Sequence, residues 1–307
     1  MSRVEGKVFI VQGPTASGKT TLAIQLALQL NTEIISADSR QFYQEMSIGT
    51  AKPSAAELAQ VKHHFVHSHS IHQEVSASQF AGEAKPILDD LLIQNKAAVI
   101  VGGSGMFIDA LTFGLDDIPH DKGIQEKWIR LYETEGLTFL QNELARLDPV
   151  YFSEVDTLNP VRLIRALEVI DLTQKPFSES RKGQVKHDYD IVRVGIDWER
   201  SDLYARIDER VGLMIEAGLL NEAKSLFHLR QLKALNTVGY SEFFRYWDDE
   251  FNFDETVEKI KQHTRNYAKR QLTWLKRYDD LIALNPYLPD SLIEQLAQRI
   301  ELSDRSL

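Results

Sequence analysis

The sequence predicts an α/β fold in which a parallel sheet is flanked by helices and carries an all-helical insertion domain. Short apolar segments rich in β-branched residues alternate with helical patterns over residues 8–101, and such a segment returns at residues 191–196. A glycine-rich loop joins the first strand to the first helix. Residues 118–187 show helical patterns with no strand between them. We therefore expect a core made of residues 1–117 and 188–307, interrupted by a helical domain at residues 118–187.

The loop after the first strand matches the phosphate-binding pattern G-x-x-x-x-G-K-[ST] at residues 13–20, GPTASGKT. A strand at residues 8–11 and a helix at residues 21–30 flank it in the order that the motif requires, which a chance glycine-rich turn would not explain. Lys19 is expected to reach the terminal phosphates and the Thr20 hydroxyl to ligate Mg²⁺. The motif predicts a P-loop NTPase-like core and leaves open whether the phosphate chain belongs to a nucleotide such as ATP. The expected phosphate-binding residues are Gly13, Thr15, Ala16, Ser17, Gly18, Lys19 and Thr20.

Two further strands are expected to end beside this loop. The strand at residues 32–37 ends at Asp38, and parallel strands present their carboxyl ends at one edge of the sheet. Asp38 is therefore expected to face bound phosphate and magnesium, with a helix cap or a turn as the alternative role. The strand at residues 97–101 ends in the glycine-rich segment 102–105, which suggests close approach of a substrate.

A histidine cluster follows the second strand. A zinc site is one interpretation, since His63 and His67 lie four residues apart. However, Phe65 and Val66 between them suggest a strand or loop, and no carboxylate completes a ligand set. A structural role is therefore favoured for His63, His64, His67, His69 and His72.

The remaining elements are expected to be helical. Before the insertion, helices are predicted at residues 55–61, capped by Ser54, and at residues 78–95, interrupted near Pro86. In the insertion they are predicted at residues 123–135, 137–147 and 160–173. After it, they are predicted at residues 202–217 and 257–278.

Basic residues gather on three of these helices. Arg162 and Arg165 share one face, where they either bind RNA or form salt bridges with residues such as Glu168. Arg206 and Arg210 lie four residues apart on the helix at 202–217. The helix at 257–278 carries seven basic residues interleaved with aromatic ones, which fits either a nucleic-acid face or a solvated face. The seven are Lys259, Lys261, Arg265, Lys269, Arg270, Lys276 and Arg277.

Composition excludes several classes of protein. The 307 residues contain no cysteine, so disulfides, thiolate metal sites and cysteine nucleophiles are excluded. The first strand begins within a few residues of the N-terminus and no apolar run approaches the ~20 residues of a membrane span, so we expect a soluble cytoplasmic protein. The net charge of −10 argues mildly against nucleic acid, although local clusters decide binding.

Beyond these patterns, the sequence resembles bacterial tRNA dimethylallyltransferases in a series of blocks that run in family order. The blocks lie at residues 11–20, 35–41, 46–53, 63–64, 102–107, 159–168, 238–242 and 267–274. There are departures at Ser47, where the family has Asp, and at His263, where Arg is common. Ser104 keeps the hydroxyl of the family's usual Thr, whereas Phe107 lacks the phenol that is usual there.

The resemblance implies prenyl transfer from dimethylallyl diphosphate to the exocyclic amine of adenosine 37 in the anticodon arm of tRNA, with Mg²⁺ as cofactor. Lys19, Thr20 and Asp38 would be the catalytic residues, with Asp38 as general base and Thr20 as metal ligand. Either Arg206 or Arg210 would help to neutralise the leaving pyrophosphate. The enzyme is expected to be a monomer. The tRNA contacts would be Asp38, Ser39, Arg40, Gln41, Ser104, Arg162, Arg165, Lys269 and Arg270.

Other functions compete with this one. A small-molecule or nucleotide kinase with a helical lid explains the phosphate loop and the two arginines, but not the basic C-terminal helix. A prenyltransferase acting on free adenine nucleotides would need neither the helical insertion nor that helix. A non-enzymatic RNA-binding module would not need Lys19 and Thr20 together.

Overall fold

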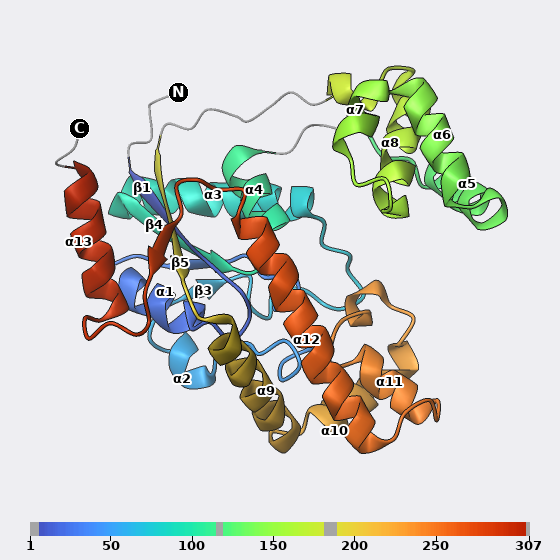
Figure 1. The fold of residues 1–307 in the computed structure, drawn as a ribbon. Helices are drawn as coiled ribbons and strands as arrows, with labels where there is room; N and C mark the ends of the chain where they lie inside the picture. Colours follow the sequence, from blue (N-terminus) through green and yellow to red (C-terminus); the bar gives the residue numbers. More distant parts are fainter. Residues whose placement is uncertain (1–5, 115–118, 181–188, 305–307) are drawn as a thin grey trace. The chain divides into compact units, whose positions relative to one another are not determined.

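The computed structural model describes residues 6–114, 119–180 and 189–304. They form a six-stranded sheet in the order β3-β2-β4-β1-β5-β6, in which every neighbouring pair of strands is parallel (Figure 1). The predicted α/β fold with a parallel sheet is thereby confirmed. β3 and β6 were not predicted from the sequence, because two or three residues are too few to show the alternation of side chains that is typical of a strand. The strands are β1 (Lys7–Gln12), β2 (Ile34–Ser36), β3 (His63–His64), β4 (Ala97–Gly102), β5 (Asp190–Ile196) and β6 (Ile282–Leu284).

Helices cover both faces of the sheet, because alternate residues of each strand point to opposite sides. Phe9 and Val11 pack with α1 (Lys19–Gln29) and α13 (Leu292–Asp304) on one face. Val8 and Ile10 pack with α3 (Ala77–Asn95) and α4 (Gly105–Phe113) on the other. Burial on both sides explains why the central strands read as continuous apolar runs.

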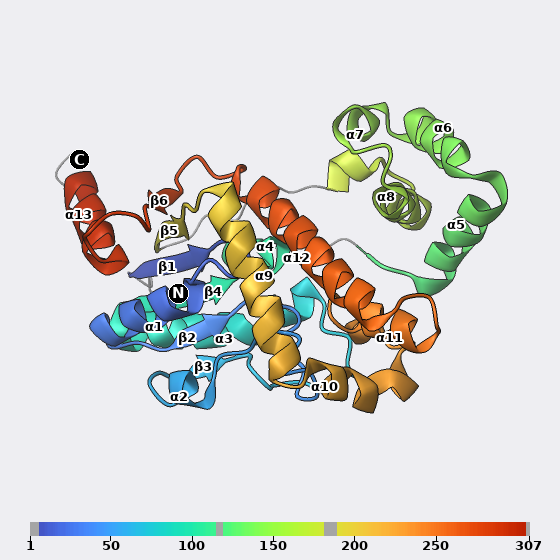
Figure 2. The same ribbon diagram turned by 60° about the horizontal axis from the view of Figure 1, so that its bottom comes forward.

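A third group of helices packs beside the sheet around Val211, Leu219, Tyr240, Phe243 and Ile260. Within it, α9 and α12 lie side by side (Figure 2). The group consists of α9 (Arg200–Glu216), α10 (Leu219–Leu226), α11 (Ser241–Trp247) and α12 (Phe253–Leu275). Shorter elements are α2 (Ala55–Leu58) and the 3-10 turns Phe227–Leu229 and Lys233–Leu235.

Predictions about the bounds of three helices were wrong. α2 ends at Leu58 rather than at residue 61. α3 runs through Pro86 without a break, because Pro86 and Gly82 both lie on the exposed side of the helix. Water can bond the Gly82 carbonyl that Pro86 leaves without its helical N–H partner. α12 begins four residues earlier than expected, since Asn252 and Glu255 form a capping box at its start.

The chain divides into two compact units, Met1–Thr112 with His187–Leu307, and Phe113–Lys186. The second unit has its own core around Trp128, Leu140, Leu144 and Leu167. Its elements are α5 (Lys122–Glu135), α6 (Leu137–Leu147), α7 (Pro149–Glu154), α8 (Pro160–Thr173) and the 3-10 turn Phe177–Ser180. The predicted boundaries at 117/118 and 187/188 fall outside the described residues. Within the part of the chain that the structure describes, no helix is both long and apolar enough to cross a bilayer.

Candidate active site

The phosphate loop lies between β1 and α1, in the strand–loop–helix order that the motif predicts. Ala16 and Gly18 have left-handed backbone conformations, with φ of 63° and 93°, which turn the loop tightly into the helix. The Ser17 hydroxyl is buried and has no hydrogen-bond partner among the described residues. It lies against Gly13, 3.0 Å from the position that a Cβ would take there. An unsatisfied buried donor in this loop fits an anionic ligand.

Lys19, the first residue of α1, points back across the loop. Its Nζ donates a hydrogen bond of 2.6 Å to the Pro14 carbonyl. Burial and the nearby Arg210 guanidinium lower the pKa of the Lys19 ammonium to about 8, against the opposing effect of Asp38. The ammonium therefore lies in a place that favours an incoming negative charge.

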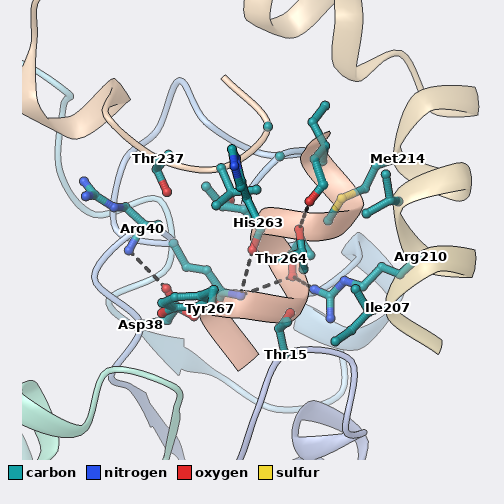
Figure 3. A pocket seen from close by; sticks show the side chains of 18 of the residues that line it. Thr15, Asp38, Arg40, Ile207, Arg210, Met214, Thr237, His263, Thr264 and Tyr267 are labelled. Carbon is teal, nitrogen blue, oxygen red and sulfur yellow. Dashed lines mark hydrogen bonds between the residues drawn. The ribbon is translucent and has the colours of Figure 1, made fainter. Parts of the chain in front are cut away.

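A cavity of about 580 Å³ opens beside the loop. It is bounded by the ends of β2 and β4, by the segment 49–53 and by α9 and α12 (Figure 3). A second hollow, of about 290 Å³, shares Lys19, Thr20 and Arg210 with it and reaches Ala16, Ser17 and Gly18. The predicted site residues that line the main cavity are Thr15, Lys19, Thr20, Asp38, Ser39, Arg40, Gln41 and Arg270.

Asp38 lies two residues after the end of β2 and lines the main cavity, as its place near the strand end predicts. Its Oδ1 accepts a hydrogen bond of 3.1 Å from the Arg40 backbone N–H. Tyr267 of α12 lies beside it (Figure 3), and burial together with the Asp38 charge raises the pKa of the Tyr267 hydroxyl. Asp38 thus combines a turn-forming hydrogen bond with a place in the cavity wall, and its role towards phosphate and magnesium stays a prediction.

Ser104 lies at the end of β4, next to Asp38's neighbour Ser39. The Ser104 Oγ accepts a hydrogen bond of 3.1 Å from the Ser39 N–H and lies 3.3 Å from the Ser39 hydroxyl. Ser104 therefore ties the ends of β2 and β4 together. Phe107, by contrast, packs among Phe42 and Phe80 in the core, where a phenol would need a partner.

The glycines at residues 102–105 are required by the chain itself. A Cβ at Gly102 would lie 2.2 Å from the Ala37 carbonyl oxygen. A Cβ at Gly103 would lie 2.0 Å from Gln271 Nε2, and one at Gly105 would lie 2.1 Å from Trp274 Nε1. The end of β2 and helix α12 thus occupy the space that side chains at these glycines would need. Gly102 also lines the main cavity, so the close approach of a substrate stays a prediction.

Gln271 is the site residue that sequence reasoning missed. It is 7% exposed, and its side chain bridges the two glycine-rich loops. Its Oε1 accepts from the Thr15 N–H at 2.9 Å, and its Nε2 donates to the Gly103 carbonyl at 3.1 Å. Two signals were available, namely its place beside Arg270 in the basic helix and its place inside the family-like block at residues 267–274.

Arg206 and Arg210 of α9 contact different parts of the site. Arg206 stacks on Trp198 at 4.4 Å, and its Nε donates a 2.9 Å hydrogen bond to the Ala16 carbonyl in the phosphate loop. Arg210 lines both hollows and donates from Nη2 to the Ala51 carbonyl at 3.4 Å. Burial lowers the pKa of the Arg210 guanidinium, with Asp38 and Glu57 opposing. Arg210 is therefore a partly buried cation that lines the cavity together with Lys19.

The basic residues predicted to bind RNA differ in their surroundings. Lys269, Arg270 and Arg162 are exposed. Arg165 instead pairs with the fully buried Glu168, with 2.9 Å between Nη1 and Oε2, and donates to the Pro119 carbonyl. On α12, Arg265 pairs with Asp208. The salt-bridge alternative thus holds for Arg165, which lies with Arg162 in the second unit.

The histidine cluster has structural partners, and the described residues contain no group of three or more His, Cys, Asp or Glu side chains placed to hold a metal. His64 contacts Glu33 at 2.6 Å and His69 contacts Glu83 at 3.2 Å. For Mg²⁺, the Thr20 hydroxyl and the Asp38 carboxylate supply oxygen ligands at one cavity. That set fits a Mg²⁺ ion that is held mainly by substrate phosphates and water.

The comparisons with known proteins agree with this geometry. Residues 41–278 match the family model described as IPP transferase. A tRNA dimethylallyltransferase from Christiangramia forsetii is 45% identical over 267 residues, covering 86% of this chain and 88% of that protein. The tRNA dimethylallyltransferase 1 of Bacteroides fragilis is 40% identical over 296 residues, covering 96% and 98%.

By their names, the solved structures that resemble this chain also belong to enzymes that modify tRNA in this way. The tRNA isopentenylpyrophosphate transferase of Bacillus halodurans superposes with a TM-score of 0.71 at 32% identity, covering 97% of this chain and 96% of that one. A eukaryotic dimethylallyltransferase acting on tRNA superposes with a TM-score of 0.78 at 25% identity, covering 96% and 77%. The resemblance of the sequence blocks is thereby confirmed, and the chain belongs to the IPP transferase family.

Proposed function

We propose that this protein transfers the dimethylallyl group of dimethylallyl diphosphate to the exocyclic amine of adenosine 37 in the anticodon arm of tRNA. The observation that carries the proposal is that the phosphate loop and Asp38 face one cavity in a chain of this family. The cavity is large enough for a small diphosphate and one base. The base must leave its stack to reach it. The predicted cytoplasmic location and monomeric state form part of the same proposal.

The reaction forms a C–N bond, breaks a C–O bond and transfers one proton from the amine. The adenine nitrogen attacks carbon one of the prenyl group, and the bond from that carbon to the diphosphate oxygen breaks, with the electron pair leaving on pyrophosphate. Asp38 accepts the proton from the amine, which is a poor nucleophile without a base. The phosphate-loop N–H groups, Lys19 and Arg210 stabilise the charge that develops on the leaving group.

We further propose that Mg²⁺ accompanies the diphosphate, with the Thr20 hydroxyl as its ligand from the protein. The ion would supply charge neutralisation for the leaving group. Asp38 acts as the general base rather than as a metal ligand, because the amine has no other proton acceptor among the proposed contacts.

Incubation with unmodified tRNA, dimethylallyl diphosphate and Mg²⁺, followed by mass analysis of the nucleosides, tests the proposal. A prenylated adenosine at position 37 is expected, and a tRNA with another base at that position serves as the control. Phosphate transfer or robust ATP hydrolysis with no prenylated nucleoside would favour a kinase or an NTPase instead. Prenylation of free adenine nucleotides in preference to tRNA would show that tRNA is not the acceptor.

A further inference from the structure

The segment 47–53 supplies part of the wall of the main cavity. Gly49, Thr50, Ala51 and Pro53 line that cavity. Ala51 and Pro53 also line the smaller hollow, together with Lys19 and Arg210. The position of this segment therefore sets the width of the space between Arg210 and the phosphate loop.

One carboxylate outside the cavity holds the first half of the segment. Glu222, in the first turn of α10, accepts from the backbone N–H groups of Ser47 and Ile48 through Oε2, at 2.9 and 2.8 Å. Its Oε1 accepts from the Gly49 N–H at 2.9 Å and from the Tyr240 hydroxyl at 2.6 Å. Three successive N–H groups directed at one carboxylate form an anion-binding concavity, which this chain fills with its own side chain.

The Tyr240 ring leaves no room for a side chain at residue 49, so only glycine fits there. Tyr240 is fully buried, and a Cβ at Gly49 would lie 2.5 Å from its ring. Burial, and then the neighbouring Glu222 charge, raise the pKa of the Tyr240 hydroxyl, so it stays a hydrogen-bond donor. Gly49, Tyr240 and Glu222 therefore fit together as a set, which we call the Glu222 clamp.

The second half of the segment accepts a hydrogen bond from Arg210 of α9. Gln41 Nε2 donates to the Thr50 and Ala51 carbonyls at 3.2 and 3.1 Å. The Ala51 carbonyl also accepts the Arg210 Nη2 hydrogen bond at 3.4 Å. A shift of the segment would thus move an acceptor that orients the Arg210 guanidinium.

We propose that Glu222 is a positioning residue for diphosphate binding. The Glu222 clamp fixes the segment 47–51, whose Ala51 carbonyl keeps Arg210 directed at the phosphate loop. The proposal rests on the proposed function only in taking the loop's ligand to be a diphosphate, and it does not depend on what accepts the prenyl group. A residue that merely joined α10 to the core would affect folding stability and leave diphosphate affinity of the folded protein unchanged.

Titration calorimetry of the full-length protein with inorganic pyrophosphate and Mg²⁺ tests the proposal. Glu222→Gln places an amide NH₂ against backbone donors, and we expect pyrophosphate affinity to fall about tenfold or more, the size of a lost charged hydrogen bond. Tyr240→Phe keeps the ring and removes one hydrogen bond, so a smaller fall is expected. Glu216→Gln, at an exposed residue near the end of α9, is the matched control and should bind as the wild type does.

A double-mutant cycle separates positioning from simple destabilisation. In an Arg210→Met background, Glu222→Gln should cause no further loss of pyrophosphate affinity, because its effect passes through Arg210. Additive losses, or wild-type affinity in Glu222→Gln or Tyr240→Phe protein that urea denaturation shows to be folded, would overturn the proposal. If Glu222→Gln does not fold, Tyr240→Phe and its own cycle with Arg210→Met decide the question. Failure of tRNA prenylation would leave these binding results intact.

Discussion

Asp38 is the residue on which the proposed chemistry depends, and Asp38→Asn tests its role. Asparagine keeps the shape and one acceptor oxygen but cannot accept a proton at neutral pH. We expect the chemical step to slow by roughly 10²–10⁴-fold, with donor affinity nearly unchanged. Single-turnover rates at saturating donor and Mg²⁺ measure the first quantity, and calorimetry measures the second. Weakened donor binding with near-normal turnover would instead identify Asp38 as a holder of the metal.

Lys19 illustrates a conflict between stability and function at one residue. Because the folded protein lowers the pKa of Lys19 from 10.5 to about 8, the unfolded chain binds more protons between these values. The free energy of unfolding therefore rises from pH 8 to pH 10 through this group, and the charged lysine costs stability below pH 8.

Lys19→Met should accordingly be more stable than the wild type at pH 7 and should abolish prenyl transfer. The stability advantage should shrink as the pH rises towards 10, since the wild-type lysine then loses its charge. Urea denaturation of both proteins at pH 7, 8, 9 and 10 measures the difference. A constant difference across this range would contradict the lowered pKa.

At the scale of elements, α12 and α8 are where the proposed RNA contacts lie. Replacing Arg162, Lys269 and Arg270 by alanine should weaken tRNA binding and reduce the salt dependence by about one unit of log–log slope for each contact. Donor binding should stay unchanged. A control variant removes the same amount of charge elsewhere, and it should keep the wild-type salt slope of tRNA binding. It replaces Lys62, Lys85 and Lys224 by alanine. Arg165 is best left in place in this test, because its removal would deprive the buried Glu168 of an ion-pair partner.

The same elements show what the sequence can and cannot predict. The phosphate loop, α6 and α8 were predicted with bounds close to the observed ones, because their motif, caps and periodicity are local. Gln271 could not be found that way, since its partner Thr15 lies 256 residues away in the chain. Its role becomes visible only when α12 packs on the end of the sheet. The continuous α3 was missed for a similar reason, because Pro86 is tolerated through exposure rather than through any sequence signal.

At the scale of the whole molecule, the two units have separate cores, so damage to one should spare the binding function of the other. Leu144→Ala removes a fully buried side chain from the second unit and should cost about 2–5 kcal/mol of its stability. We expect tRNA affinity to fall while pyrophosphate affinity, which depends on the first unit, stays at the wild-type value. Calorimetry with each ligand measures this, and parallel losses of both affinities would show that the units do not act separately.

The bridging Gln271 has a thermodynamic consequence for how the two substrates affect each other's binding. Its immediate neighbour Arg270 is exposed on the helix that is proposed to contact RNA, while Gln271 itself bonds the loop that is proposed to hold the donor. If both substrates bind through α12, any coupling free energy between them is reciprocal. Whatever factor bound tRNA imposes on donor affinity, bound donor imposes on tRNA affinity, so each substrate's dissociation constant has to be measured both with and without the other.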